Sequence, residues 1–541
     1  MIPFPLDREK SLLSFDSYSD STFRYGREVS LCDALMNAQN YVDLAGETPP
    51  QDVAVLRLLL AVLHTVFSRV DETGAPAPIC TTDQALQRWN ALWSTGALPQ
   101  KPINDYLNTK HERFWLFHPQ YPFWQVPEAA IGTAYEASKL NGEISESGNK
   151  RRMFTLYAGS GKDKLSYSQA ARWLLYVNGY DDTSAKPKGK GLPSVGAGWL
   201  GKIGLITAQG ENLFETLLLN LTFLKDGETL WGPEVPCWEL NPPHSGERTE
   251  IPQPDNQAQL LTLQSRRLLL HRENGAVTGY SLLGGDFFQK ENAFSEQMTI
   301  WRGASAGKDA PVVYQPRRHD PSRQFWREFP VMFADEDGGH RPGIVSWLIR
   351  LQSTRVLDRK RMIRFAIAGV EYGDKDFFIT DSFSDALTFH LGLLENMSKR
   401  WRSDITHEIG RCDQLASCLG DLAKGLAWAQ GDLESSGTAA VKEQFYFRLD
   451  QPFRLWLACI DPSWDEEERQ KSITDWHKTI LGLAREQGED MVKQAGPVAF
   501  AGRSVSQTIG KGKNEKTVTV HYSAPEAFNR FLRAIYKAVE E

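Results

Sequence analysis

The sequence predicts an α+β protein in which a large mixed α/β domain, residues 1–383, is followed by a C-terminal helical bundle of the four-helix type, residues 384–541. Two observations carry this prediction. Strand-like alternation occurs between about residues 260 and 380, in a region that also contains helical patterns. From residue 384 onward the sequence is almost wholly amphipathic and helical, which is typical of a bundle.

The N-terminal half begins with predicted helices. Apolar residues recur at helical spacing over residues 30–44, and residues 51–70 are apolar nearly all round, which predicts a buried helix. Residues 166–177 open with a serine cap and continue at helical spacing. Residues 210–224 predict another buried helix.

The aromatic stretch HERFWLFHPQYPFWQVP, residues 111–127, cannot form one regular element, because each proline lacks a backbone donor. It predicts a loop that lines the core. The side chains expected to fill that core are those of Phe114, Trp115, Phe117, Phe123 and Trp124.

Two hairpins are predicted in the middle of the chain. Residues 262–285 alternate on either side of an ENG turn, which favours two antiparallel strands. Residues 361–383 predict a second pair of short strands, joined at Tyr372 to Lys375. After them, DSFSDAL at 381–387 offers Ser384 or Asp385 as the N-cap of the first bundle helix.

Composition describes an ordinary globular protein. The 541 residues are 41% hydrophobic and 24% charged, with a formal net charge of -7. A nucleic-acid binder of this charge has to concentrate its positive residues locally. The six cysteines form no C-x-x-C pair, so we expect no zinc site and a reducing compartment. With no signal peptide and no long apolar run, we expect a cytoplasmic protein that contacts no membrane.

One stretch departs from the acidic balance. Residues 186–202, KPKGKGLPSVGAGWLGK, hold five glycines and four lysines and no acid. Glycine lets a backbone approach a ligand closely, and lysine pairs with anions, so a phosphate-bearing partner is one interpretation. A surface loop with solvated lysines is the other. Further basic spots lie at 150–152, at 266–267, at 317–327 and at 503–516.

Motifs for catalysis are weak. The sequence has no G-x-S-x-G elbow, no phosphate loop of the G-x-x-x-x-G-K-[ST] type and no H-E-x-x-H helix. His319 and Asp320 could serve a nuclease metal, as could the acids near residue 381, but neither group has partners at ligand spacing. We therefore predict no catalytic residue, no metal and no cofactor.

An ordered set of segments resembles a known family. RLLLAVLH at 57–64, FWLFHPQYPFWQV at 114–126, GNKRRMF followed by AARWLLY, then QSRR, QMTIWR, AGPVAF and GR occur in the same order in the CasA family, the large subunit of the type I-E CRISPR complex Cascade. The set spans nearly the whole chain. The resemblance implies a non-catalytic subunit of an RNA-guided surveillance complex whose partners are double-stranded target DNA, the CRISPR guide RNA, the backbone and small subunits, and a recruited helicase-nuclease.

The resemblance also implies where DNA binds. In the family the N-terminal domain reads a protospacer-adjacent motif through the minor groove with a glycine-rich loop, here Gly189 to Gly198. The predicted DNA-binding set of this loop is Lys186, Lys188, Gly189, Lys190, Gly191, Gly196, Gly198 and Lys202. The family's groove-reading lysine from the middle β region has no match near Ser281, and Arg266, Arg267 or Lys290 could replace it.

Two further sites follow from the same resemblance. A strand-separating wedge maps onto Gly373, Asp374, Lys375 and Asp376, where Lys375 has to supply the favourable contact because acids are repelled by phosphates; an ordinary polar turn is the alternative. Contact with the guide RNA end and a neighbouring subunit maps onto Asn149, Lys150, Arg151 and Arg152.

Three functions remain open at this point. The chain is a DNA-reading subunit that helps to split the duplex for guide pairing, or a metal-dependent nuclease, or a scaffold that serves assembly alone.

Overall fold

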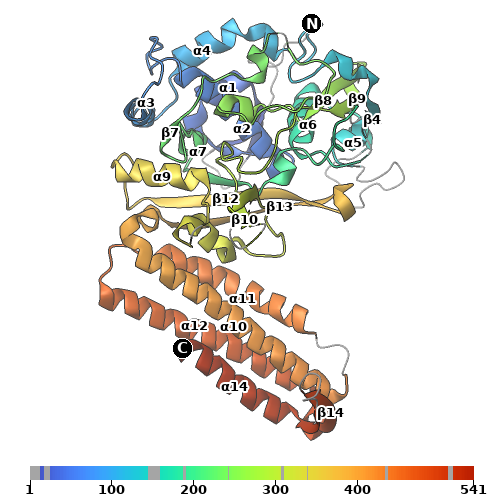
Figure 1. Ribbon diagram of the computed structural model, residues 1–541, viewed down its shortest axis with the longest axis vertical. Coiled ribbons are helices and arrows are strands. Elements are labelled where there is room, and N and C mark those ends of the chain that lie inside the picture. The colour runs from blue at the N-terminus through green and yellow to red at the C-terminus, as the bar shows by residue number, and fades with distance from the viewer. Residues whose placement is uncertain are drawn as a thin grey trace. The chain divides into compact units, whose positions relative to one another are not determined.

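The computed structural model describes residues 13–17, 25–143, 159–184, 186, 190–241, 243–305, 307, 310–337, 339–432, 437–509 and 516–540. The chain divides into two compact units. Unit 1 comprises Met1–Arg323, Val331–Asp358 and Ile363–Ala386, and unit 2 comprises Gln324–Pro330, Arg359–Met362 and Leu387–Glu541. The predicted fold class, a mixed α/β part followed by a helical bundle, is confirmed (Figure 1).

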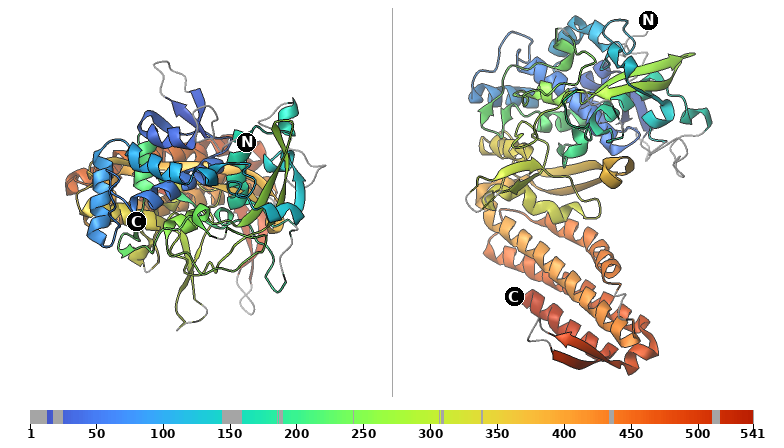
Figure 2. Two further views of the ribbon diagram at one scale, coloured as in Figure 1. Left: turned by 90° about the horizontal axis from the view of Figure 1, so that it is seen from above. Right: turned by 45° about the vertical axis from the view of Figure 1, so that its right-hand side comes forward.

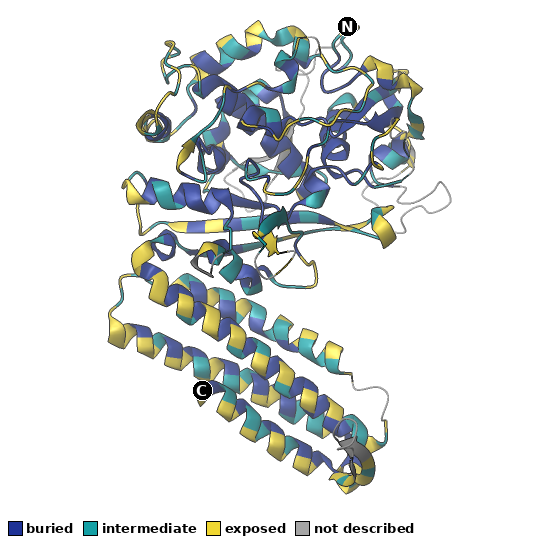
Figure 3. Cartoon of the chain, in the orientation of Figure 1, coloured by how far each residue is buried: buried dark blue, intermediate teal, exposed yellow. Residues whose placement is uncertain are grey.

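Unit 1 is built around an apolar helix, α2. This helix is long and apolar enough to cross a membrane, but 94% of its apolar stretch is buried inside the protein, as in the core helix of a globular fold. It packs against α6 and α8, and most of its ribbon has the colour of buried residues in Figure 3. The described helices of unit 1 are α1 Leu31–Met36, α2 Pro49–Phe67, α3 Thr82–Ser94, α4 Gln100–Thr109, α5 Ala137–Leu140, α6 Tyr167–Tyr180, α7 Leu213–Asn220, α8 Gln257–Leu261 and α9 Gly343–Ser353.

Small antiparallel sheets surround these helices. The three-stranded sheets have the orders β2-β1-β3, β4-β9-β8 and β13-β12-β5, and β6-β7 and β10-β11 form two-stranded ribbons. The strands are β1 Leu13–Ser17, β2 Tyr25–Val29, β3 Tyr41–Leu44, β4 Thr133–Glu136, β5 Ile206–Gln209, β6 Leu224–Lys225, β7 Thr229–Leu230, β8 Arg266–Glu273, β9 Ala276–Gly284, β10 Trp301–Ala304, β11 Val313–Pro316, β12 Met362–Tyr372 and β13 Ile379–His390.

Both predicted hairpins are present. In the first, β8 and β9 pair antiparallel across Asn274 and Gly275, whose φ angles of 48° and 80° suit a tight turn (Figure 2). In the second, β12 and β13 are neighbours in one sheet, and β12 also pairs with β5. The long strands of both hairpins are visible in Figure 2.

The aromatic stretch at 111–127 lines the core as predicted, although unevenly. Phe114, Phe123 and Trp124 are buried, whereas Trp115 and Phe117 are half-buried. The stretch has one 3-10 turn at His111–Phe114 and another that begins at Pro127, and the proline-containing segment between them is irregular, as predicted.

The predicted N-cap at 384–385 is wrong. Ser384 and Asp385 lie inside β13, and the first bundle helix begins only at Lys399. Leu387 and Phe389 are buried while the residue between them is less so, which is the two-residue period of a strand. The predicted domain boundary after residue 383 therefore falls within this strand.

Unit 2 is a bundle of long helices whose ribbons alternate between buried and exposed faces in Figure 3. Helix α10 packs against α11, α12 and α14. A short hairpin, which the sequence analysis did not predict, lies between α13 and α14. The elements are α10 Lys399–Gln430, α11 Thr438–Cys459, α12 Glu466–Gln494, α13 Gly496–Ala501, β14 Arg503–Ile509, β15 Lys516–Tyr522 and α14 Ala524–Glu540.

Candidate nucleic-acid interface

The glycine and lysine loop follows directly from α6. That helix starts with a capping box in which the Ser166 hydroxyl accepts from the N–H of Gln169. At the far end of the loop, the N–H of Gly198 donates to the carbonyl oxygen of Asp181 at 2.9 Å. A Cβ on Gly198 would lie 2.3 Å from the carbonyl oxygen of Gly179, so this glycine is needed for close backbone packing and not for contact with a ligand.

Lys186 does not point outward as the sequence analysis expected. Its ammonium group lies 2.9 Å from a carboxylate oxygen of Asp181 and donates to the carbonyl oxygen of Asp182 at 2.8 Å, and its side chain is fully buried. Burial alone would raise the pKa of Asp182, but Lys186 and Lys139 lower it below its ordinary value. Lys186 is therefore paired with the two acids that follow α6. These ion pairs hold the base of the loop against the end of the helix.

The outer part of the loop is exposed where it is described. Lys190 and Gly191 are both exposed, and Gly191 has a φ of +76° with open space around the position of a Cβ. Lys188 and Gly189 lie outside the described residues. Lys190 is thus available to an anion at the tip of the described loop.

Lys202 lies in a small cationic recess behind the loop. Gly196 faces it, with the position of a Gly196 Cβ 3.5 Å from Cε of Lys202. Burial, followed by the repulsion of Arg266, Lys290 and Arg248, lowers the pKa of Lys202 from its ordinary 10.5 to about 8. Among the residues that the structure describes, none forms a hydrogen bond or an ion pair with the Lys202 ammonium group. Positive charge is therefore concentrated around Lys202, and no described acid is paired with this lysine.

Arg266 and Arg267 are not available to a groove. Each is only 2% exposed, and their guanidinium groups are paired with Asp181 and Asp286 respectively. Of the three replacements that the sequence left open for the groove-reading lysine, only Lys290 is exposed. The two arginines instead brace β8 against the end of α6 and the segment after β9.

The predicted wedge is the turn between β12 and β13. The N–H of Gly373 donates to the carbonyl oxygen of Phe378 at 2.9 Å, which closes the turn. Lys375 and Asp376 both have left-handed backbones, with φ angles of 52° and 60°, which L residues seldom adopt. Next to them, Phe377 is 47% exposed. A turn with two such residues holds a fixed and unusual shape.

The wedge turn is joined to the base of the loop. The N–H of Thr183 donates to the carbonyl oxygen of Asp376 at 2.9 Å, and its hydroxyl donates to the carbonyl oxygen of Lys375 at 2.8 Å. Arg318 donates to both carboxylate oxygens of Asp376 at 2.9 and 2.8 Å, and to the carbonyl oxygen of Gly201. The structure thus brings the glycine and lysine loop and the predicted wedge together. The ion pair with Arg318 also neutralises Asp376, one of the two acids in the turn that would otherwise repel phosphates.

Sequence analysis did not single out Thr183 or Phe377, and it included Arg318 only in the basic spot at 317–327. Thr183 bonds Lys375, which is 192 residues further along the chain, and Arg318 bonds Asp376, which is 58 residues further along, so no local pattern could have paired them. Phe377 follows the DKD turn directly, but the sequence does not distinguish an exposed aromatic side chain at this position from a buried one.

The predicted guide-RNA contact lies outside the described residues. Asn149, Lys150, Arg151 and Arg152 belong to the range 144–158, of which the structure describes nothing. The same holds for Lys511 and Lys513.

The residues considered for a nuclease have other contacts. His319 is buried and donates from Nε2 to the carbonyl oxygen of Leu205 at 2.9 Å. A carboxylate oxygen of Asp320 accepts from the N–H and the hydroxyl of Ser322. Within the described ranges, no three histidine, cysteine, aspartate or glutamate side chains group as metal ligands do.

Fold and site together define a class: a large protein with a mixed α/β unit that carries a cationic loop and a rigid hairpin turn, and a helical bundle. The family described as CRISPR-associated protein Cse1 matches residues 22–487, and the chain belongs to that family. The family predicted from the ordered motifs, that of the type I-E Cascade large subunit, is thereby confirmed.

Known relatives agree with this assignment. The CRISPR-associated protein CasA/Cse1 of Thermus thermophilus is 31% identical over 317 residues, which cover 58% of this chain and 57% of the relative, little more than half of its length. The crystal structure of Thermobifida fusca Cse1 is 28% identical, with a TM-score of 0.79 over 98% of this chain and 97% of that one. A chain of a CRISPR RNA-guided surveillance complex shares the fold at 17% identity, with a TM-score of 0.65 over 97% and 98%.

Proposed function

We propose that this protein is the large, non-catalytic subunit of an RNA-guided CRISPR surveillance complex, in which it recognises a short protospacer-adjacent motif in double-stranded DNA and helps to open the duplex for pairing with the guide RNA. Membership of the Cse1 family supports the place in the complex. The division of labour is physically consistent, because base pairing reads the long target and the protein reads only a short flank.

One observation carries the DNA-reading role. The exposed Lys190 and Gly191 stand on a loop whose base is fastened to the wedge turn through Thr183 and Asp376. A protein that holds a duplex with one element and separates its strands with another needs the two elements at a fixed spacing. If the wedge could move freely relative to the loop, binding of the duplex would not position the wedge at a base step. The hydrogen bonds and the Arg318 ion pair supply that spacing.

Cations near the loop would hold the DNA backbone. No acid within the described ranges forms an ion pair with Lys190, Lys202 or Lys290, so these lysines can displace the counterions of nearby phosphates. The minor groove presents a degenerate acceptor pattern, and a glycine-rich backbone reads its width more than its bases. We therefore expect a permissive motif, with several flanking sequences accepted.

The remaining partners follow from the family. We propose that the bundle of unit 2 contacts the small subunits and the displaced strand, that residues 149–152 contact the guide RNA, and that the assembled protein helps to recruit a helicase-nuclease in the cytoplasm. The nuclease alternative receives no support from His319, whose Nε2 is already bonded to backbone.

The experiment is binding of the assembled complex to guide-matched duplexes that differ only in the flanking base pairs. Wild type is compared with the double variant Lys190→Glu, Gly191→Asp, which places acid on the exposed loop. A matched control is Lys101→Glu, Gly96→Asp, because Gly96 is also an exposed glycine with positive φ and open space, away from the loop.

We expect wild type and control to discriminate among flanks, and the loop variant to lose binding while the complex still assembles. Equal binding by all three proteins would rule out the loop as the motif reader. Binding by wild type without any preference among flanks would favour an assembly-only scaffold, and cleavage of DNA by the purified chain with magnesium, lost in His319→Ala, would favour the nuclease.

A further inference from the structure

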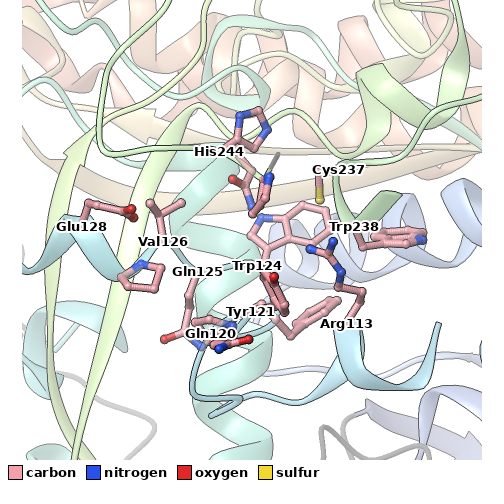
Figure 4. Close-up of a pocket in the computed structure, with 15 residues that line it drawn as sticks. Arg113, Gln120, Tyr121, Trp124, Gln125, Val126, Glu128, Cys237, Trp238 and His244 are labelled. Carbon is pink, nitrogen blue, oxygen red and sulfur yellow. Dashed lines mark hydrogen bonds between the residues drawn. The ribbon is translucent and has the colours of Figure 1, made fainter. Parts of the chain in front are cut away.

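A pocket in unit 1 and a larger one in unit 2 lie apart from the loop and the wedge turn. The first has a volume of about 100 Å³ and is formed by segments 113–128 and 237–244 together with Gln264 (Figure 4). This volume suits a few water molecules. The second has a volume of about 330 Å³, which is within the range of pockets that bind apolar groups.

The larger pocket, which we call the bundle pocket, lies where α10 packs against α14. The two helices approach closely at Gly425 and Ala527, and the position of a Gly425 Cβ is 3.1 Å from Cβ of Ala527. Larger side chains stand around this point and enclose the pocket. It is defined by Cys418, Lys424, Trp428, Tyr522, Arg530 and Ala534.

The wall of the bundle pocket is largely apolar. Trp428, Cys418 and Ala534 are half-buried, so part of each side chain is accessible to a ligand. Leu422 and Phe531 also line the pocket but are only 2% and 3% exposed, so they form its packed floor. An apolar group placed here would remove the accessible parts of the wall from water.

Two cations gather at one end of the bundle pocket. Nζ of Lys424 lies 4.6 Å from the centre of the Trp428 ring, and Cζ of Arg530 lies 5.4 Å from that of Tyr522. The two rings contact each other edge to face, with centroids 4.8 Å apart, so both charged groups lie at the same end. Both residues are exposed, and within the described ranges neither cation forms an ion pair or a hydrogen bond. This end of the pocket therefore attracts an acid.

Asp421 gives the bundle pocket a direction. It is the acid among the lining residues, it is exposed, and it lies about one helical turn before Lys424 in α10. A carboxylate on a ligand is repelled by Asp421 and attracted by the two cations. A ligand that carries an acid beside an apolar group is therefore held in one orientation.

We propose that the bundle pocket binds an acidic segment of a partner protein, which inserts one aromatic or long aliphatic side chain while a neighbouring carboxylate pairs with Lys424 and Arg530. An apolar anchor in a pocket, with exposed charges around it, is typical of protein-binding surfaces. A site for a small ligand encloses most of that ligand, whereas here both cations stand exposed at the rim. The inference goes beyond the motif-reading function and does not depend on it.

The test uses the purified full chain and isothermal titration calorimetry. The probe is the capped peptide acetyl-Gly-Asp-Asp-Phe-Asp-Asp-Gly-amide. Two comparison peptides carry alanine in place of the phenylalanine, or lysine in place of every aspartate. Free 3-phenylpropanoate tests whether a small carboxylate is sufficient, and a single-stranded heptanucleotide tests whether the surface binds nucleic acid instead.

The variant Lys424→Glu, Arg530→Glu reverses both charges at the rim, and we expect it to bind the acidic peptide about tenfold more weakly than wild type. Lys399→Glu, Lys471→Glu is the matched control, because it makes the same change of charge at exposed bundle residues that do not line the pocket. Ala534→Phe fills the pocket without changing its charge and should also weaken binding. Alanine in place of the peptide's phenylalanine should cost about thirtyfold in affinity, as for a buried anchor.

Binding that requires the phenylalanine, the aspartates and the two rim cations supports the proposal. It is overturned if the alanine or the lysine peptide binds as tightly as the probe, or if the charge-reversed variant binds the probe as wild type does. Binding of 3-phenylpropanoate as tight as that of the peptide would make this a site for a free carboxylate and overturn the proposal. So would absence of peptide binding at millimolar concentration, with or without binding of the heptanucleotide.

Discussion

The backbone N–H of Thr183 donates a 2.9 Å hydrogen bond to the carbonyl oxygen of Asp376, which lies in the turn between β12 and β13. This bond connects the base of the glycine and lysine loop to the wedge turn. The Thr183 hydroxyl adds a second bond, to the carbonyl oxygen of Lys375 at 2.8 Å. Because both bonds end on residues with left-handed backbones, the loop helps to hold the unusual shape of the turn.

Removing the charge of Asp376 should therefore affect opening of DNA more than stability. In Asp376→Asn the ion pair with Arg318 is lost, but this pair is about one-third exposed on each side, so we expect the free energy of unfolding to fall by less than about 1 kcal/mol. The rate of duplex opening, followed by 2-aminopurine fluorescence beside the motif, should fall several-fold. Asp374→Asn changes an exposed acid of the same turn and serves as the control; an equal loss in both variants would contradict a specific role for the Asp376 ion pair.

The charge of Lys202 should make DNA binding depend on pH. Its pKa is lowered to about 8, so the lysine loses its proton as pH rises from 7 to 9 and with it any attraction to phosphate. We expect affinity for motif-containing duplex to fall by roughly threefold to tenfold over this range, for the loss of one phosphate contact. Lys202→Arg stays charged and should show little of this dependence; a wild type and an arginine variant with the same pH profile would exclude Lys202 as a DNA contact.

The same lysine should reduce the stability of the folded protein. Its pKa is about 8 when folded and near 10.5 when unfolded, so protonation favours the unfolded state below pH 8, and the penalty disappears as pH rises through 8 toward 10.5. Lys202→Met should raise the free energy of unfolding at pH 7 by on the order of 1 kcal/mol while weakening DNA binding. Urea denaturation of wild type and Lys202→Met at pH 7 and at pH 10 measures this effect. The difference in the free energy of unfolding between the two proteins should be smaller at pH 10.

Arg266 should behave as a structural residue. Its buried pairing with Asp181 means that Arg266→Met leaves a carboxylate in a buried site, and we expect a loss of about 3 kcal/mol in the free energy of unfolding. Lys290→Gln, at an exposed position, should change stability by no more than about 0.5 kcal/mol but weaken DNA binding. If Arg266→Met were as stable as wild type and still lost DNA binding, Arg266 would be a direct contact after all.

Local patterns in the sequence predicted the local structure well. The Asn274 and Gly275 turn and the alternation around it gave the β8–β9 hairpin, because both signals act over a few residues. The predicted helix N-cap at Ser384 or Asp385 was wrong because these residues belong to β13. The alternating burial of Leu387 and Phe389 indicates the strand, and pairing within the sheet outweighs the local preference for a helix cap.

Two contacts could not be predicted from residue types. The outward orientation expected for Lys186 was wrong although its partners are local, because the turn after α6 places the carboxylates of Asp181 and Asp182 against its ammonium group. The ion pair that neutralises Asp376 comes from Arg318, which is 58 residues away in the chain. Residue type alone therefore does not show whether a charged side chain is free for a ligand, since that depends on which acids the fold places beside it.

Phe377 should be the residue of the wedge turn that holds the strands apart. It is 47% exposed beside two residues of fixed left-handed backbone, so its ring projects from a rigid support. An apolar side chain inserted at a base step separates neighbouring bases, and stacking on one base contributes about 1–3 kcal/mol. Phe377→Ala should therefore lower the fraction of opened duplex about tenfold in the 2-aminopurine measurement, while binding to a duplex with a premade bubble stays unchanged. Phe377→Trp should retain opening, and Met362→Ala, which alters an exposed apolar residue at the other end of β12, should have no effect. Opening that is lost equally on the intact and the bubbled duplex would place Phe377 in DNA binding instead of strand separation.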